Sequence, residues 1–168
     1  MATRRILTED DETLRKKSRA VTNFDERLHL LLDDMAETMR EASGAGLAAV
    51  QVGVLRRAVV IETELGDLIE LINPEVCESE GEQNDAEGCL SLPGIYGMVN
   101  RPMTVTIKAQ DRNGKPFTMT GDGLTARAFC HEIDHLDGVV FTSFVTKYVD
   151  KETFYNSRND KRGKKKKT

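Results

Sequence analysis

Hydrophobic residues recur at helical spacing in two stretches of the chain. Across residues 25–44, leucines and methionines return every three or four positions and form one stripe, which predicts a helix that stops near Gly44. A second helix is predicted over residues 124–137, with Gly138 just past its end. A shorter helix is expected within residues 7–18, with Thr8 as its N-cap.

Between these helices the pattern changes to short apolar runs and strict alternation. Residues 58–62 and 68–73 predict two strands, the second of them ended by Pro74. Residues 103–111 alternate between polar and apolar, and the pair Asn113-Gly114 that follows is a strong hairpin signal. This order predicts an α+β fold, with mainly antiparallel sheets packed around a central C-terminal helix that carries the sequence HEIDH (residues 131–135).

Length and composition narrow the class of protein. With 168 residues, 39% of them hydrophobic and 31% charged, the chain fits one globular domain, which we place at residues 1–160. Three cysteines without paired spacing argue against a disulfide framework and for a reducing compartment. The N-terminus has no targeting signature and no apolar run approaches ~18 residues, so we expect a cytoplasmic protein that contacts no membrane.

Charge is unevenly distributed along the chain. The formal net charge is −4, but six basic residues lie within residues 161–168, so the rest of the chain carries −10. An acidic domain is not typical of a general nucleic-acid binder, and we expect no contact with DNA. Residues 161–168 are expected to form a disordered basic tail that alone could touch phosphates.

The late helix holds two of the three histidines. His131 and His135 are about 40° apart around the axis and ~6 Å apart along it, so both imidazoles can reach one ion. Glu132 lies about 100° round from His131, which is too far for a ligand but well placed for a general base on metal-bound water. Leu124 and Ala128 share the histidine face, while the opposite face is apolar, so we expect burial on both sides.

The helix alone does not identify the third protein ligand. His29 lies in the first predicted helix and is interpreted as an ordinary surface residue, and Cys130 points about 100° away from its neighbour and is interpreted as a packed hydrophobe. Glu152 lies at a spacing that some zinc peptidases use. Cys89, in the sequence EGCLSLPG, would leave the fourth tetrahedral position to water, as catalytic sites do.

Three ordered blocks carry a resemblance to a known family. GAGLAAVQ (residues 44–51), EGCLS (residues 87–91) and HEIDH fit the forms GxGLAAxQ, EGCLS and HExDH. In these blocks, and over roughly residues 8–145, the sequence resembles the peptide deformylases. Of the two candidates for the third ligand, the resemblance favours Cys89.

The resemblance implies a reaction and a cofactor. A peptide deformylase removes the formyl group from the N-terminal formyl-methionine of nascent polypeptides, as metal-bound hydroxide attacks the formyl carbonyl. One divalent ion is implied, Fe²⁺ in the first place with Zn²⁺ or Ni²⁺ as alternatives, held by Cys89, His131 and His135. Glu132 would carry the proton from water to the leaving amine. Five further residues are implied to line the substrate cleft, and two to stabilise the oxyanion: Gly46, Gly88, Ala45, Leu124 and Ala128, then the Gln51 amide and the Leu90 backbone N–H.

Several positions near these blocks bear on the pocket. Glu87 and Arg101 match a pair that the family keeps for structural reasons. Ala45 stands where Ile or Val is usual, which would widen the cleft. Asp85 and Arg127 stand where relatives are often apolar, so they could pair at the pocket rim or alter the preference for the residue after Met.

Two other functions are possible from the residues alone, and one macromolecular partner is expected. The chain could be a metallopeptidase that cuts internal peptide bonds, with Glu152 or another carboxylate as third ligand. It could also be a non-catalytic domain that a metal stabilises, in which Glu132 has no role. Relative to some members of the family, the C-terminus lacks a long amphipathic helix for docking on the ribosome. We therefore expect its lysines to make at most a weak contact with ribosomal RNA.

Overall fold

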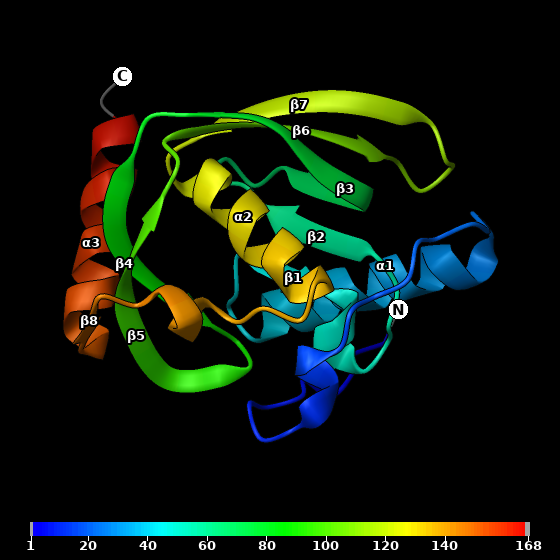
Figure 1. Ribbon diagram of the computed structural model, residues 1–168, viewed down its shortest axis with the longest axis horizontal. Coiled ribbons are helices and arrows are strands. Elements are labelled where there is room, and N and C mark those ends of the chain that lie inside the picture. Colours follow the sequence, from blue (N-terminus) through cyan, green and yellow to red (C-terminus); the bar gives the residue numbers. More distant parts are fainter. Residues whose placement is uncertain (1, 167–168) are drawn as a thin grey trace.

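The computed structural model describes residues 2–166, and side chains as far as residue 159 (Figure 1). The helices are α1 (Glu26–Glu41), α2 (Leu124–Leu136) and α3 (Lys151–Lys166), with 3-10 turns η1 (Glu12–Arg15), η2 (Ala49–Val52) and η3 (Phe141–Phe144). The strands are β1 (Gly46–Ala48), β2 (Ala58–Glu62), β3 (Leu68–Glu80), β4 (Gln83–Cys89), β5 (Leu92–Arg101), β6 (Thr104–Gln110), β7 (Pro116–Asp122) and β8 (Lys147–Val149).

The strands form two antiparallel sheets with α2 between them. One sheet has the order β1-β2-β3-β6-β7 and the other the order β4-β5-β8. Figure 1 shows α2 running through the centre of the molecule, flanked by β1 to β3 and by β4. The predicted α+β architecture around the helix with HEIDH is therefore confirmed.

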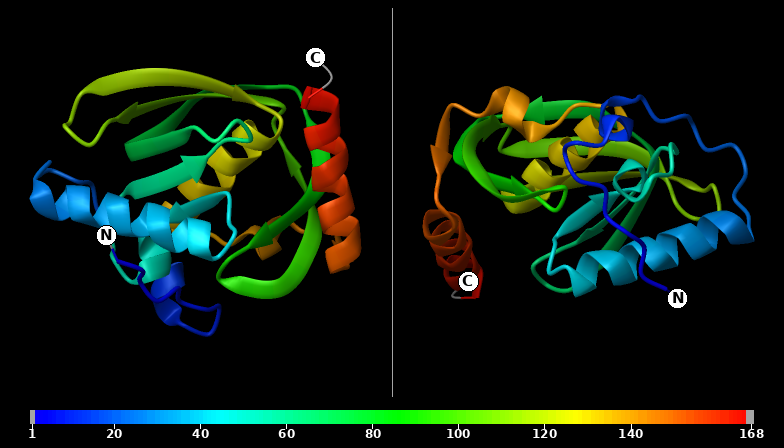
Figure 2. Two further views of the ribbon diagram at one scale, coloured as in Figure 1. Left: turned by 180° about the vertical axis from the view of Figure 1, so that it is seen from behind. Right: turned by 90° about the horizontal axis from the view of Figure 1, so that it is seen from below.

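The five-stranded sheet is buried on both faces at β2. Successive residues of a strand point to opposite sides, and in β2 Val59 and Ile61 join the core under α2, while Ala58 and Val60 join the core under α1. Because α1 and α2 cover opposite faces, β2 reads as an uninterrupted apolar run. Figure 2 shows α1 on the outside of this sheet, away from α2.

Several predicted elements are confirmed at their positions. Strand β2 covers the predicted residues 58–62, α2 begins at Leu124, and the β6–β7 hairpin turns at Asn113-Gly114, where Gly114 has φ 84°. The prediction that Pro74 ends a strand is wrong, because β3 continues to Glu80. Pro74 lies in a bulge between two registers of the β3–β6 pairing, next to Asn73 with φ 52°, and bulges tolerate the missing N–H of proline.

The sequence did not predict β1, β4, β5, β8 or α3. The backbone of α3 is helical as far as Lys166, whereas a disordered tail was expected from residue 161. Residues 167 and 168 lie outside the described residues. The first turn is 3-10 rather than α-helical, and its N-cap is Asp11 rather than Thr8. No helix in the described part of the chain is both long and apolar enough to cross a membrane.

Candidate metal centre

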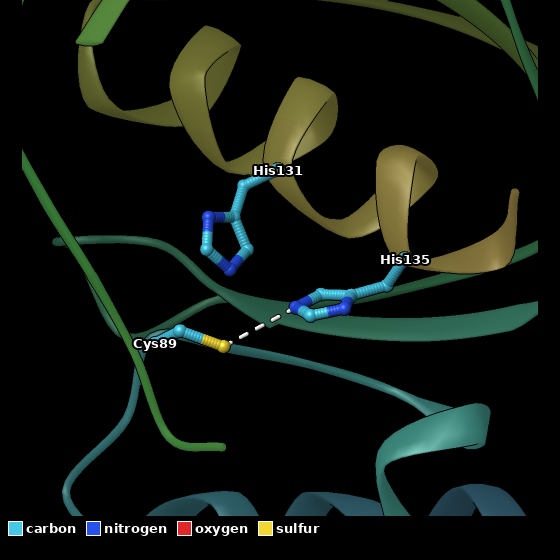
Figure 3. A group of neighbouring side chains, drawn as sticks. All are labelled: Cys89, His131 and His135. Carbon is cyan, nitrogen blue, oxygen red and sulfur yellow. Dashed lines mark hydrogen bonds between the residues drawn. The ribbon is translucent and has the colours of Figure 1, made fainter. Parts of the chain in front are cut away.

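Three side chains of metal-ligand type meet between the two sheets. Cys89 ends β4, and His131 and His135 lie one turn apart on α2 (Figure 3). Their ligand atoms all lie within 4.8 Å of one another, and the Cys89 Sγ is 3.2 Å from the His135 Nε2. Among the residues that the structure describes, they form the only such group of histidine, cysteine or acidic side chains. One thiol and two imidazoles fit a four-coordinate divalent ion with one open position.

A buried carboxylate fixes the orientation of His131. The Nδ1 of His131 is 2.7 Å from the Glu87 Oε2, so Nε2 is the nitrogen left for a ligand bond. Arg101 donates to both oxygens of Glu87, at 3.1 and 2.7 Å. Burial alone would raise the pKa of Glu87, but the hydrogen bonds and charges of His131 and Arg101 outweigh it and hold this pKa well below its usual range.

The two imidazoles differ in their protonation when no ion is bound. Burial, reinforced by the charge of His131, lowers the pKa of His135 well below its ordinary value. Burial opposes protonation of His131 as well, but its hydrogen bonds to Cys89 and Glu87 raise its pKa well above the ordinary value. In the absence of an ion, the surroundings therefore favour a proton on His131 and disfavour one on His135.

Glu132 is a buried acid at the edge of the group. Its Oε1 lies 3.7 Å from the His131 Nε2, and its Oε2 has no hydrogen-bond partner among the described residues. Burial raises its pKa from 4.5 to about 7. Gly46 packs directly on this carboxyl group, because a Cβ added there would lie 3.1 Å from it. A carboxyl group with a pKa near neutrality can both accept and return a proton.

Gln51 presents its amide N–H groups to the cysteine. The Oε1 of Gln51 accepts from the Ala48 backbone N–H at 2.9 Å, which determines which end of the amide faces the site. Its Nε2 then donates to the Ser91 Oγ at 3.1 Å and lies 3.5 Å from the Cys89 Sγ. Leu90 follows Cys89 in the turn between β4 and β5.

The residues expected to line a substrate cleft have different surroundings. Gly46 is in contact with Glu132, and Gly88 packs on Tyr96, where an added Cβ would lie 2.7 Å from a ring carbon. The remaining three are exposed or half-buried, one before β1 and two on α2: Ala45, Leu124 and Ala128. Ala128 was expected on the histidine face, but it packs against the core under the five-stranded sheet, as Cys130 does.

Asp85 and Arg127 have separate partners. The Asp85 Oδ1 accepts from the Ser157 Oγ at 2.6 Å, and its Oδ2 is 3.6 Å from the Arg158 Nη1, so the partners lie on α3. Arg127 instead donates to Glu87 at 2.9 Å. The sequence did not indicate either arrangement, although the spacing of Arg127 and His131, four residues on one helix, could have placed both on the same face.

The other residues considered as ligands lie elsewhere. Glu152 is exposed in the first turn of α3 and is not part of the group. The ring Nε2 of His29 is 2.8 Å from the Arg112 backbone oxygen. Cys130 packs against the core under the five-stranded sheet.

Comparisons with known proteins agree with one another. Residues 3–151 match the family model described as Polypeptide deformylase. The chain is 56% identical over 163 residues to the peptide deformylase of Caldicellulosiruptor bescii, covering 96% of this chain and 98% of that protein. It is 54% identical to the enzyme of Acetivibrio thermocellus over 162 residues, covering 96% and 95% of the two chains.

Solved structures give the same result. The crystal structure of a peptide deformylase from Legionella pneumophila superimposes with a TM-score of 0.83 at 44% identity, covering 99% of this chain and 96% of that one. The peptide deformylase from Thermotoga maritima gives a TM-score of 0.84 at 36% identity, covering 87% and 99%. The chain belongs to the polypeptide deformylase family, enzymes that remove the formyl group from the N-terminus of nascent peptides.

Proposed function

We propose that this chain is a metal-dependent deformylase that acts on N-terminal formyl-methionine and holds one divalent ion with Cys89, His131 and His135. The observation that carries the proposal is the convergence of these three side chains, with ligand atoms within 4.8 Å of one another. The hydrogen bond from His131 to Glu87 supports it, because metal-binding histidines commonly bond a carboxylate through their other nitrogen.

A divalent ion at this place would act as a Lewis acid and lower the pKa of water toward ~7. Thiolate and imidazole ligands accept several first-row ions, so Fe²⁺ is proposed as the native ion on the family resemblance, with Zn²⁺ and Ni²⁺ as alternatives.

Glu132 is proposed as the proton carrier of the reaction. Its carboxylate takes a proton from the attacking water, and the resulting carboxylic acid donates that proton to the leaving amine. A pKa near 7 suits both transfers, because neither protonation state is then strongly disfavoured at neutral pH. The Gln51 amide and the Leu90 backbone N–H are proposed to donate to the oxyanion that forms on the formyl group.

The substrate is proposed to enter between β1 and β4. These are edge strands of their sheets, so each has backbone groups available to an extended peptide. Gly46 on β1 and Gly88 on β4 are the proposed neighbours of the peptide main chain. Three residues around the start of α2 and before β1 are proposed to contact the methionine side chain: Leu124, Ala128 and Ala45.

The test is formate release from formyl-Met-Ala, measured anaerobically with Fe²⁺ or Ni²⁺. We expect release by the native protein, loss of both metal and activity in Cys89→Ala, and retention of both in Cys130→Ala, the matched control on the core side of α2. A metallopeptidase with Glu152 as ligand would keep its metal in Cys89→Ala. If the folded, metal-loaded native protein releases no formate, the proposal fails.

Two proposals concern the setting of the reaction. Nascent chains are made in the cytoplasm, and we propose that the protein works there. A weak, salt-sensitive contact between residues 161–168 and ribosomal RNA is also proposed, on the basis of the six basic residues in that segment. Co-sedimentation with ribosomes should weaken when residues 161–168 are deleted, and unchanged co-sedimentation would refute the contact.

A further inference from the structure

Arg127 is a fully buried arginine beside the proposed metal centre. It is 2% exposed and lies four residues before His131, so both side chains leave α2 on nearly the same face. The Nη1 of Arg127 donates to the Glu87 Oε1 and to the Val99 backbone oxygen, each at 2.9 Å. Its Nε and Nη2 have no hydrogen-bond partner among the described residues.

Burying this guanidinium is unfavourable, and the fold already has another arginine on the same carboxylate. Burial lowers the pKa of Arg127 despite the opposing charge of Glu87, so the ion pair does not fully offset the loss of water. Arg101 also donates to both Glu87 oxygens. Arg101 already neutralises the charge of Glu87, so charge neutralisation does not explain why Arg127 is buried there as well.

The hydrogen bonds of Glu87 show what Arg127 adds. Oε1 accepts from Arg101 and Arg127, and Oε2 accepts from Arg101 and the Nδ1 of His131. Arg101 comes from β5, whereas Arg127 comes from the same helix as His131. Arg127 and His131 thus hold the two oxygens of one carboxylate from two successive turns of α2, which fixes the rotation of the carboxylate relative to that helix.

We propose that Arg127 is a positioning residue for the metal centre: by holding the Oε1 of Glu87 and the Val99 carbonyl, it keeps the Oε2 of Glu87 aligned with His131, so that this imidazole presents its Nε2 to the ion. The inference rests on the proposed metal ligands. It does not depend on the chemical reaction, and it is tested by metal binding and spectroscopy.

Positioning and simple electrostatics predict opposite results. Removing a buried positive charge near a cation site should by itself strengthen cation binding. Loosening the residue that orients a ligand weakens binding instead, typically by roughly 10- to 100-fold for groups that bond a metal-binding histidine. The sign of the change in Arg127→Met therefore separates the two.

The experiment measures Zn²⁺ dissociation constants by chelator competition for the native protein, Arg127→Met, Arg127→Lys and Arg158→Met. Arg158 is the matched control, because the contacts described for it reach the Ala86 backbone oxygen and the Asp85 carboxylate on the same strand rather than Glu87. We expect Zn²⁺ to bind roughly 10- to 100-fold more weakly to Arg127→Met. Arg127→Lys should recover part of the loss, and Arg158→Met should bind Zn²⁺ as tightly as the native protein.

Two further measurements tie the effect to Glu87. In the Zn²⁺-loaded protein, the Nδ1 proton of His131 should exchange with solvent faster in Arg127→Met than in Arg158→Met, as followed by ¹H–¹⁵N NMR. In a Glu87→Gln background, Arg127→Met should cause little additional loss of Zn²⁺ affinity, because residues that act through one another are not additive.

Unchanged or tighter Zn²⁺ binding by folded Arg127→Met would overturn the inference, and so would full additivity with Glu87→Gln. A variant with native Zn²⁺ affinity but an altered KM for formyl-Met-Ala would assign Arg127 to the substrate pocket instead. If the native protein binds Zn²⁺ through these residues but releases no formate, the proposed activity fails while the positioning role still stands.

Discussion

Replacing Glu132 by glutamine should disable the enzyme and, in the metal-free state, stabilise it at high pH. Glu132 is 4% exposed and its Oε2 has no hydrogen-bond partner in the described part of the chain. The loss of the proton carrier should reduce the rate of formate release by roughly 10²–10⁴-fold. Burial raises the pKa of Glu132 from 4.5 to about 7, so its charged form destabilises the folded protein.

The sign and size of the stability change follow from that shift. Well below pH 4.5 the carboxyl group is protonated in both the folded and the unfolded chain, and its ionisation does not affect folding. As the pH rises toward 7, the unfolded chain loses the proton first, so the free energy of unfolding decreases until the folded protein also ionises. The shift corresponds to at most roughly 3 kcal/mol, and glutamine removes this pH-dependent penalty.

The assay is urea unfolding of the metal-free native protein and Glu132→Gln at several pH values between 4 and 8, together with formate release by the metal-loaded forms. The difference in unfolding free energy should grow with pH in favour of the variant and level off above pH 7. Glu152→Gln is the control, since Glu152 is exposed on α3, and it should change neither quantity. A difference that stays constant with pH would refute the burial argument, and an active Glu132→Gln would refute its role as proton carrier.

Three other changes test the remaining parts of the site. Gln51→Leu should lower kcat by roughly 10²–10³-fold while the protein keeps its metal. It should also reduce stability, because the Ala48 N–H loses its hydrogen-bond acceptor. A native kcat in this variant would remove Gln51 from the oxyanion site. Gly46→Ala places a Cβ 3.1 Å from the Glu132 carboxyl, so the carboxyl must shift. We expect the rate of formate release to fall by up to roughly 10²-fold while the urea midpoint changes little. An unaffected rate would show that Glu132 tolerates the shift. Zn²⁺ affinity should increase between pH 6 and pH 8, because the pKa of His131 is raised and the ion must displace its proton. Chelator competition at several pH values measures this, and an affinity that does not change with pH would show that His131 is neutral before binding.

The sequence predicted an element or a group of site residues correctly where all the residues that define it lie in one helix, strand or hairpin. The apolar face of α2 and the spacing of its two histidines are properties of one helix, and strand β2 and the hairpin at Asn113-Gly114 also depend on nearby residues only. The histidine pair, Glu132 and the core contact of Cys130 could therefore be predicted from the residues alone.

The rest of the site depends on pairing between distant segments. Strands β4 and β5 are rich in glycine and polar residues and form because they pair with each other and because α3 and η3 pack against them. No periodicity marks such strands, so the residues alone left Cys89 as one candidate for the third ligand beside Glu152, and the family resemblance decided between them. Ser91 as a partner of Gln51, and Arg127 as a partner of Glu87, are contacts between segments at least 40 residues apart. An arginine on a predicted helix is by default a surface residue, and only the folded chain shows this one to be buried.

The charges around the centre fit a doubly charged ion. Arg101 bridges Glu87 and Asp134, at 2.7 Å to each, and Arg127 adds a second guanidinium to Glu87, so two cations offset two carboxylates one layer away from the ligands. The groups left facing the site are the Cys89 sulfur and the Glu132 carboxyl, which carry two negative charges when both are ionised. A buried charge is stable only when it is paired, and a divalent cation would pair with both of these negative charges. In the metal-free protein the shifted pKa values act in the same direction, because the raised pKa of His131 favours a positive charge at the site and the raised pKa of Glu132 disfavours a negative one.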